Sequence, residues 1–196
     1  MEIKRLIIVA VGGQGNLLAS KVLAEAAMLE KIPVRMSEIH GMAQRGGVVE
    51  SSLVFGDAQS TIISDGRADV LLAFEPSEAL RALPRCNARS VVITNTAPLP
   101  PFTAAIGKGV YPPVEDIKRL LAEKTARLVA VNAAHLAAEA GSPLSVNMVL
   151  LGALIQTRVL PIPPETVKKA IGDTVKKAFV DINIKAFDLG FAAATL

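Results

Sequence analysis

The chain has 196 residues, of which 51% are hydrophobic and 20% charged, and its mean hydropathy is +0.43. This composition is typical of a globular chain with a large core, and it excludes a disordered or collagen-like polypeptide. With 21 Lys and Arg against 18 Asp and Glu, the net charge is +3, too weak a field to indicate nucleic-acid binding.

The N-terminal segment predicts a strand, a glycine turn and a helix. Residues Ile3–Val11 are nearly all β-branched or aliphatic, as in a central strand that is buried on both faces of a parallel sheet. The run Gly12-Gly13-Gln14-Gly15 then interrupts this pattern. Apolar residues recur at helical spacing from Asn16 until Pro33 ends the helix.

Three more strands and a polar loop are predicted next. Val34–Ile39 indicates a second strand, and the loop His40–Gly47 that follows is dense in Gly, Gln, Met and Arg. Val48–Phe55 and Ser60–Ser64 predict two strands joined around Gly56-Asp57, which together would form a β-hairpin.

The remaining sequence continues the alternation of strands and helices. Further strands are predicted at Val70–Phe74, Ser90–Thr94 and Arg127–Val131, and helices at Pro76–Leu83, Val114–Lys124, Ala133–Ala140, Val146–Thr157, Glu165–Ile171 and Thr174–Ala193. The proline-rich stretch Ala97–Pro113 predicts an irregular surface segment. We therefore expect residues 1–196 to form one α/β, Rossmann-like three-layer domain. It would have a mostly parallel central sheet, a β-hairpin addition and C-terminal helices.

The glycine turn is the first candidate site. Glycines between a buried strand and a helix bring bare N–H groups and the helix dipole up to an anion. The candidate cofactor-binding residues are Gly12, Gly13, Gln14, Gly15 and Asn16. Leu18 stands where a dinucleotide-binding fingerprint needs a third small residue, although Glu38 lies at the distance of a ribose-binding carboxylate. The turn therefore either binds a ribose phosphate, with a close backbone approach at Gly13, or is only a tight turn.

The loop after the second predicted strand is the second candidate site. Glu38 and His40 are candidate acid–base groups, and Arg45 could hold a carboxylate or phosphate through two hydrogen bonds. Because carboxyl ends of parallel strands meet at one edge of a sheet, this loop and the glycine turn should lie side by side. An equally open interpretation is that Glu38 and Arg45 pair with each other and only order the loop.

Other polar residues favour structural roles. Asn95 and Asn147 are better explained as caps or loop clamps than as chemical groups, because Asn readily bonds nearby backbone. The single cysteine, Cys86, excludes an internal disulfide, a Cys-rich zinc site and a self-contained iron–sulfur cluster. We expect no metal site on this chain and a reducing, cytoplasmic location.

Two motifs together carry a resemblance to a known family. The Gly12–Gly15 turn with its helix, and the run Ser37–Gly47, resemble the gamma-type domain of the 2-oxoacid:ferredoxin oxidoreductases. Within that family, His40-Gly41-Met42 before Ala43-Gln44-Arg45-Gly46-Gly47 is similar to the indolepyruvate type. Asn95 after a strand and Asn147 further along also match, so the resemblance covers essentially the whole chain.

The resemblance implies a subunit, inactive alone, of an enzyme that oxidatively decarboxylates indolepyruvate or other arylpyruvates to acyl-CoA and passes electrons to ferredoxin. Thiamine diphosphate, Mg²⁺ and the 4Fe-4S clusters would belong to a larger partner subunit, because one cysteine cannot ligate a four-iron cluster. Coenzyme A is a candidate contact of the glycine turn. The residues expected at the substrate or subunit interface are Gly41, Met42, Gln44, Gly46, Gly47, Asn95 and Asn147.

Two other functions are weighed against this one. The main alternative is a free-standing Rossmann-type module for nucleotide binding or sensing, in which Glu38 would hold a ribose. Nucleic-acid binding is disfavoured because the basic residues are dispersed over predicted helices and no aromatic platform is evident. The longest uncharged run, Ala140–Thr157, carries several polar residues, so it predicts a core helix and no membrane span.

Overall fold

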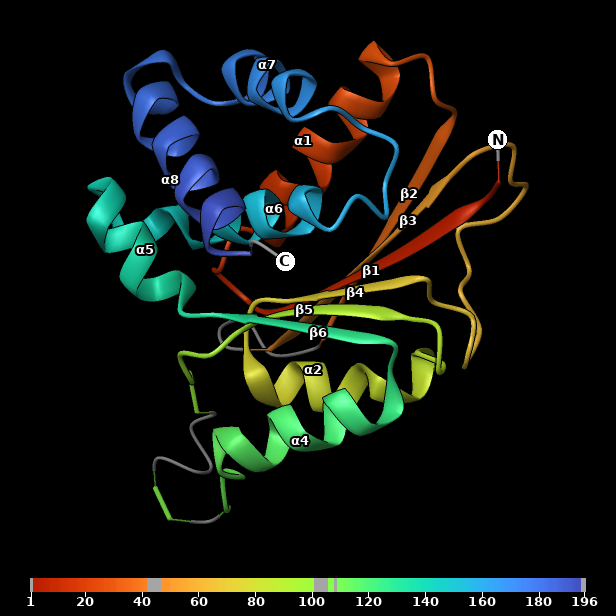
Figure 1. The fold of residues 1–196 in the computed structure, drawn as a ribbon, viewed down its shortest axis with the longest axis vertical. Coiled ribbons are helices and arrows are strands. Elements are labelled where there is room, and N and C mark those ends of the chain that lie inside the picture. The colour runs from red at the N-terminus through yellow and green to blue at the C-terminus, as the bar shows by residue number, and fades with distance from the viewer. Residues whose placement is uncertain (1, 42–46, 101–105, 108, 195–196) are drawn as a thin grey trace.

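A mixed sheet forms the centre of the computed structural model, which describes residues 2–41, 47–100, 106–107 and 109–194 (Figure 1). The sheet has six strands in the order β2-β3-β1-β4-β5-β6. Their bounds are β1 (Lys4–Val11), β2 (Val34–His40), β3 (Val48–Phe55), β4 (Val70–Ala73), β5 (Val91–Asn95) and β6 (Arg127–Val131). The pairs β1–β4, β4–β5 and β5–β6 are parallel, whereas β3 runs antiparallel to both β1 and β2. The predicted mostly parallel sheet is confirmed.

The β-hairpin lies one strand earlier than the sequence predicted. β3 pairs with β2 over the register Val34–Phe55 to His40–Val49, and with β1 on its other side. Both edges of β3 are therefore occupied, and no edge remains for a strand at Ser60–Ser64. That segment is irregular, and its Ile63 packs into the core beneath the sheet. The predicted pairing around Gly56-Asp57 was wrong.

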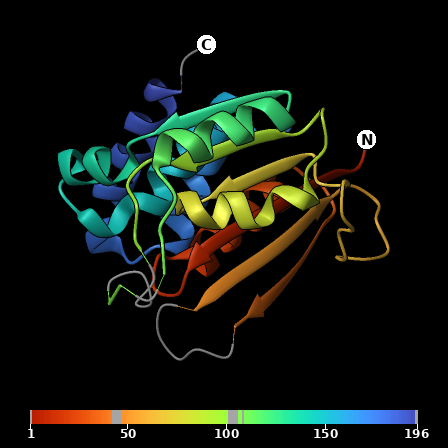
Figure 2. The ribbon, with the colours of Figure 1, turned by 90° about the horizontal axis from the view of Figure 1, so that it is seen from below.

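Helices cover both faces of the sheet, which confirms the three-layer α/β architecture (Figures 1 and 2). One face carries α1 (Asn16–Leu29), α5 (Ala133–Ala140), α6 (Val146–Gln156), α7 (Pro164–Thr174) and α8 (Val180–Ala193). The other face carries α2 (Pro76–Ala82) and α4 (Val114–Lys124). The described residues also form the short 3-10 turns η1 (Leu83–Arg85), η2 (Pro143–Ser145) and η3 (Lys177–Phe179). In the part of the chain described, no helix combines the length and apolar character needed to cross a membrane.

The central position of β1 explains its composition. Leu6 and Ile8 point into the core under α1 and α6, while Ile7 and Val9 point into the core under α2 and α4. A strand that is covered on both faces has no place for a polar side chain, so alternation is lost. The prediction of a central strand from Ile3–Val11 is confirmed.

The helix α6 is buried on every side from Asn147 to Ile155, as its uniformly apolar sequence predicted. It packs so closely against α8 that the backbones of the two helices are in contact. A Cβ added to Gly152 would lie 2.0 Å from the carbonyl oxygen of Phe187, and one added to Gly190 would lie 1.9 Å from that of Val149. Glycine at both positions is therefore a condition for the contact between the two helices.

The predicted helix Thr174–Ala193 is interrupted near its start. Val175 is extended, with φ −90° and ψ 147°, and ends α7, after which η3 precedes α8. Val175 packs against the core, and the Asn183 side-chain amide donates to the carbonyl oxygen of Phe179 at the start of α8, with a separation of 2.7 Å. The break in the helical pattern therefore falls at a residue whose partly buried side chain packs against the core.

Candidate functional site

The glycine turn connects the end of β1 to the start of α1. Gly13 and Gly15 have φ of +100° and +81°, values that favour glycine, and Gly15 is the residue that caps α1. The Gly12 amide donates to the carbonyl oxygen of Gly47 at 2.8 Å. The backbone of the turn is thus held against the start of β3, while Gly12 and Gly13 remain exposed.

The side chains of the turn are used within the protein. Gln14 Oε1 accepts from the amide of Val11 at 2.8 Å, and its Nε2 donates to the carbonyl of Phe74 at 3.3 Å. Asn16 is buried, and its Nδ2 donates to the carbonyl of Val49 at 3.3 Å. Among the five candidate cofactor-binding residues, the groups left facing solvent are therefore chiefly the backbone of the first two glycines.

Asn147 ties the start of α6 to the glycine turn. Its side chain is buried, and Nδ2 donates to the carbonyl of Gly15 at 3.3 Å. A Cβ added to Gly15 would lie 2.6 Å from that same nitrogen. The close approach that the sequence suggested at Gly13 is thus found at Gly15, because a Cβ on Gly13 would meet no atom within 4 Å.

Asn95 holds three backbone segments together at the end of β5. Its Nδ2 donates to the carbonyls of Phe74 (3.2 Å) and Ala97 (3.4 Å). Its Oδ1 accepts from the amides of Ala97 and Ala133, both at 3.1 Å. Every bond goes to backbone, which is the arrangement that the clamp interpretation predicts.

Glu38 and His40 lie on the edge strand β2, with side chains on the same face. Oε1 of Glu38 is 3.4 Å from Nε2 of His40, a distance at which the two groups form an ion pair when the imidazole is protonated. The Glu38 side chain is largely buried and faces Ser51 across the β2–β3 register. Oγ of Ser51 and Oε1 of Glu38 lack hydrogen-bond partners among the described residues. The structure thus brings an acid and an exposed imidazole together at this edge.

The second candidate loop begins and ends beside the glycine turn. Gly41 donates its amide to the carbonyl of Val48 at 2.8 Å, and Gly47 accepts from Gly12. The expectation that this loop and the glycine turn lie side by side is confirmed for these ends. Met42, Gln44, Arg45 and Gly46 lie outside the described residues, and so does the expected pairing of Arg45 with Glu38.

A buried carboxylate that sequence reasoning missed lies at the same edge. Glu75 follows β4, is fully buried and caps α2, where it accepts from the amides of Ser77 (2.7 Å) and Glu78 (3.1 Å). It also accepts from the amide of Leu99 (3.1 Å) and from the hydroxyl of Tyr111. Burial, and then the bond to Glu75, raise the pKa of the Tyr111 hydroxyl. The available signal was a carboxylate directly before the proline that begins a predicted helix.

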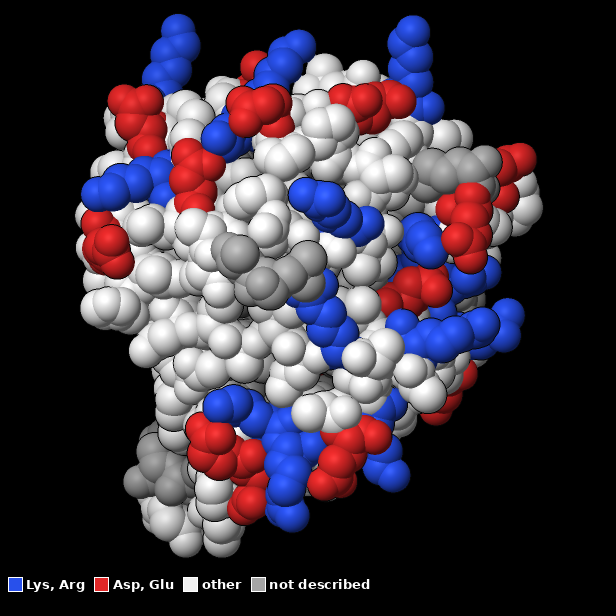
Figure 3. Space-filling model, viewed as in Figure 1, with Lys and Arg blue, Asp and Glu red and all other residues white. Residues whose placement is uncertain are grey.

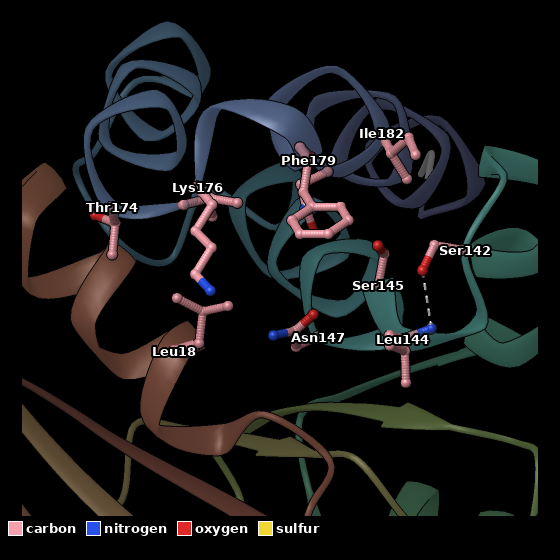
Figure 4. A pocket seen from close by; sticks show the side chains of 11 residues that line it. Leu18, Ser142, Leu144, Ser145, Asn147, Thr174, Lys176, Phe179 and Ile182 are labelled. Carbon is pink, nitrogen blue, oxygen red and sulfur yellow. Dashed lines mark hydrogen bonds between the residues drawn. The ribbon is translucent and has the colours of Figure 1, made fainter.

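A cavity of about 320 Å³ opens next to the Gly15–Asn147 contact, between α1, η2 and the η3–α8 segment (Figure 4). Its lining residues are Leu18, Ser142, Leu144, Ser145, Asn147, Thr174, Val175, Lys176, Phe179, Ile182 and Asn183. Figure 4 shows the Lys176 side chain extended toward Leu18 and Asn147. Within the described ranges, no group of three or more His, Cys, Asp or Glu residues is arranged to hold a metal ion.

Comparisons with known proteins define the class of this fold and site. The family model described as pyruvate ferredoxin/flavodoxin oxidoreductase matches residues 5–193. A solved gamma subunit of keto/oxoacid ferredoxin oxidoreductase from Geobacter sulfurreducens superposes with a TM-score of 0.71 at 25% identity, covering 97% of this chain and 98% of that one. The chain therefore belongs to the pyruvate ferredoxin/flavodoxin oxidoreductase family, and the predicted oxidoreductase-subunit class is confirmed.

A full-length relative narrows the resemblance within the family. The indolepyruvate oxidoreductase subunit IorB of Methanothermobacter thermautotrophicus is 43% identical over 189 residues, which are 96% of this chain and 96% of that protein. IorB of Pyrococcus horikoshii is 42% identical over 196 residues, covering 99% and 97% of the two chains. The predicted resemblance to the indolepyruvate type is confirmed.

Proposed function

We propose that this chain is the subunit without thiamine or iron–sulfur clusters in an oxidoreductase that acts on indolepyruvate or a related arylpyruvate. In that complex it would complete the active site for oxidative decarboxylation to an acyl-CoA, with ferredoxin as electron acceptor. The observation that carries the proposal is the 43% identity to IorB over nearly the whole length of both chains.

The chemistry of this chain supports a division of labour between subunits. Thiamine diphosphate with Mg²⁺ would supply the carbanion-stabilising chemistry, and 4Fe-4S clusters would carry the electrons. The chain has one cysteine, Cys86, which is buried, and burial raises its pKa to about 11. A buried thiol that stays protonated is a poor iron ligand, so we assign the thiamine diphosphate, the Mg²⁺ and the 4Fe-4S clusters to a larger partner subunit. The complex of the two subunits would be cytoplasmic.

The carboxyl edge of the sheet is the surface that we assign to this partner. Segments that end or follow strands at this edge expose Leu17, Ile39, Leu99 and Val110 to solvent. Figure 3 shows a stretch of uncharged surface at the middle left, at the height where β6 ends in Figure 1, between charged side chains above and below it. Several exposed apolar side chains at one end of a sheet favour a protein–protein contact surface there.

At this edge the chain's own groups would bind and position ligands. The backbone amide of exposed Gly13, just before α1, suits a phosphate or the pantetheine arm of coenzyme A, whereas the Gly12 amide is already bonded to Gly47. His40, held near Glu38, would exchange a proton at Nε2 with a group on the partner side. The loop His40–Gly47 and the clamps Asn95 and Asn147 would shape the substrate side of the interface.

The strand order of the sheet argues against the alternative of a free-standing nucleotide-binding module, because it separates Glu38 from the glycine turn. In a dinucleotide-binding fold the ribose-binding acid ends the strand next to the glycine-turn strand. Here β3 lies between β1 and β2, so Glu38 is two strand spacings, about 10 Å, from β1. Titration of the isolated chain with NAD, FAD and adenylates should give no saturable micromolar binding.

Co-expression with the cognate larger subunit tests the proposal. Reduction of a viologen dye by indolepyruvate and coenzyme A should require both chains, and each chain alone is the control. Assembly with activity toward pyruvate or 2-oxoglutarate but not arylpyruvates would contradict the substrate assignment. Failure of the two chains to assemble would contradict the subunit assignment itself.

A further inference from the structure

The cavity between α1, η2 and the η3–α8 segment is lined in part by apolar side chains that are exposed to solvent in the isolated chain. Leu144 on its rim is 85% exposed and Phe179 is 53% exposed. Leu18, Val175 and Ile182 form further parts of the wall. Because these apolar side chains line one cavity instead of being scattered over the surface, together they form a site that suits an apolar group from outside.

One cation stands at this cavity without a counter-charge. In the described part of the chain, the Lys176 ammonium group makes no ion pair or hydrogen bond, and the side chain runs along the cavity toward Leu18 (Figure 4). Lys168, on the neighbouring helix α7, is in contrast 2.8 Å from Asp188 and 3.3 Å from Glu165. The group that complements the cavity is therefore apolar and carries, or lies beside, a negative charge.

The shape favours a protein side chain over a small molecule. Small ligands are buried over most of their surface in their sites. At this cavity, Leu144 stands in solvent and would cover one side of a ligand only. Protein interfaces instead place one large side chain in a shallow depression with an exposed rim, which the partner surface then closes.

The cavity is continuous with the surface that we assign to the larger subunit. Asn147 lines the cavity and binds the carbonyl of Gly15 in the glycine turn. Leu17, two residues after Gly15 in the first turn of α1 and next to the cavity residue Leu18, is exposed. A partner that covers the carboxyl edge of the sheet therefore reaches the cavity without a gap.

We infer that this cavity is the anchor point of the larger subunit, which inserts one leucine-sized or aromatic side chain between Leu144 and Phe179 and places a carboxylate on Lys176. This inference rests on the proposed function. It assigns to the η2 and η3 segments, far apart in the sequence, a single role in assembly.

Two pairs of matched variants test the inference in the complex. Leu144→Asp and Lys176→Glu change the cavity. Ile62→Asp and Lys177→Glu are the controls, because Ile62 is 81% exposed in the segment between β3 and β4, and Lys177 is adjacent in sequence but does not line the cavity. All four positions are exposed, so the isolated variants should keep the melting temperature of the wild-type chain.

The Kd for the larger subunit should rise at least tenfold for both cavity variants and stay within twofold for both controls. If wild-type chains assemble and the cavity variants bind as tightly as the controls, the inference is overturned while the proposed function stands. Normal assembly with a raised KM for coenzyme A or indolepyruvate would also overturn it, in favour of a small-molecule site. Failure of the wild-type chains to assemble would overturn both.

Discussion

Gly13 and Gly15 occupy the same turn but are glycine for different reasons. Both have positive φ, a conformation that costs an L-residue about 1–2 kcal/mol. At Gly15 a side chain would also meet Nδ2 of Asn147 at 2.6 Å, whereas at Gly13 there is open space. The conformation and the crowding can therefore be measured separately.

Gly13→Ala should lower the free energy of unfolding by about 1–2 kcal/mol, and Gly15→Ala by about 2–5 kcal/mol, because overpacking adds to the conformational cost. Urea denaturation measures both values. In a Gly15→Ala/Asn147→Ala double variant the crowding is gone, so the loss should be less than the sum of the single losses. Equal losses for the two single alanine variants would contradict this account of the turn.

Cys86 gives the stability a dependence on alkaline pH. Burial raises the pKa of its thiol to about 11, whereas an unfolded thiol ionises near 9. Between these values the folded chain holds the proton that the unfolded chain has lost, so stability falls as pH rises. We expect the wild-type chain to lose about 2 kcal/mol more than Cys86→Ala between pH 8 and pH 10.5. Parallel pH curves for the two proteins, measured by urea denaturation, would show that the thiol does not contribute.

At the scale of elements, the contact between α6 and α8 leaves no space for a side chain at the glycines where the two helices meet. A Cβ on Gly190 would overlap the carbonyl of Val149, which belongs to the backbone of a helix and cannot move aside. Gly172 on α7 provides a matched control, because a Cβ there would meet nothing within 4 Å.

Gly190→Ala should cost about 3 kcal/mol or more through separation of the two helices, whereas Gly172→Ala should gain about 1 kcal/mol from helix propensity. Thermal unfolding followed by circular dichroism gives both signs. If both variants shift the melting temperature in the same direction, overlap with the backbone of α6 does not explain the need for glycine at position 190.

The periodicity of the sequence was sufficient for most elements. The bounds predicted for Val114–Lys124, Arg127–Val131 and Ala133–Ala140 are those observed, because caps and prolines mark their ends. The place of β3 was not predictable in this way, since strand order depends on which edges are free and not on the pattern within a strand. The break at Val175 likewise depends on a tertiary contact.

The candidate site was predictable where backbone conformation requires a residue type, and less so where a contact crosses the fold. The glycines with positive φ and the loop beside them were identified from sequence. Glu75 was not, because its role depends on the amide of Leu99 and the hydroxyl of Tyr111, which come from the proline-rich segment. The cavity at Lys176 also needs three distant segments and has no local motif.

For the whole molecule, the two edges of the sheet should differ in hydrogen exchange once the larger subunit is bound. Residues 12–17, 39–41, 96–99 and 142–147 at the carboxyl edge should gain protection, and residues 56–66 at the opposite edge should not. The core of β1, covered on both faces, should be the slowest to exchange in the free and bound states alike. Exchange measured by mass spectrometry distinguishes this pattern from uniform stabilisation, which would contradict the assignment of the edge.

Two bonds between backbone atoms, from Gly12 to Gly47 and from Gly41 to Val48, close the base of the loop after β2. None of these four groups depends on the identity of residues 42–46. A substitution among residues 42–46 therefore leaves both backbone bonds available to hold the ends of β2 and β3 at the glycine turn. A segment exchanged between Gly41 and Gly47 would therefore be joined to the same two anchoring bonds, whatever its sequence.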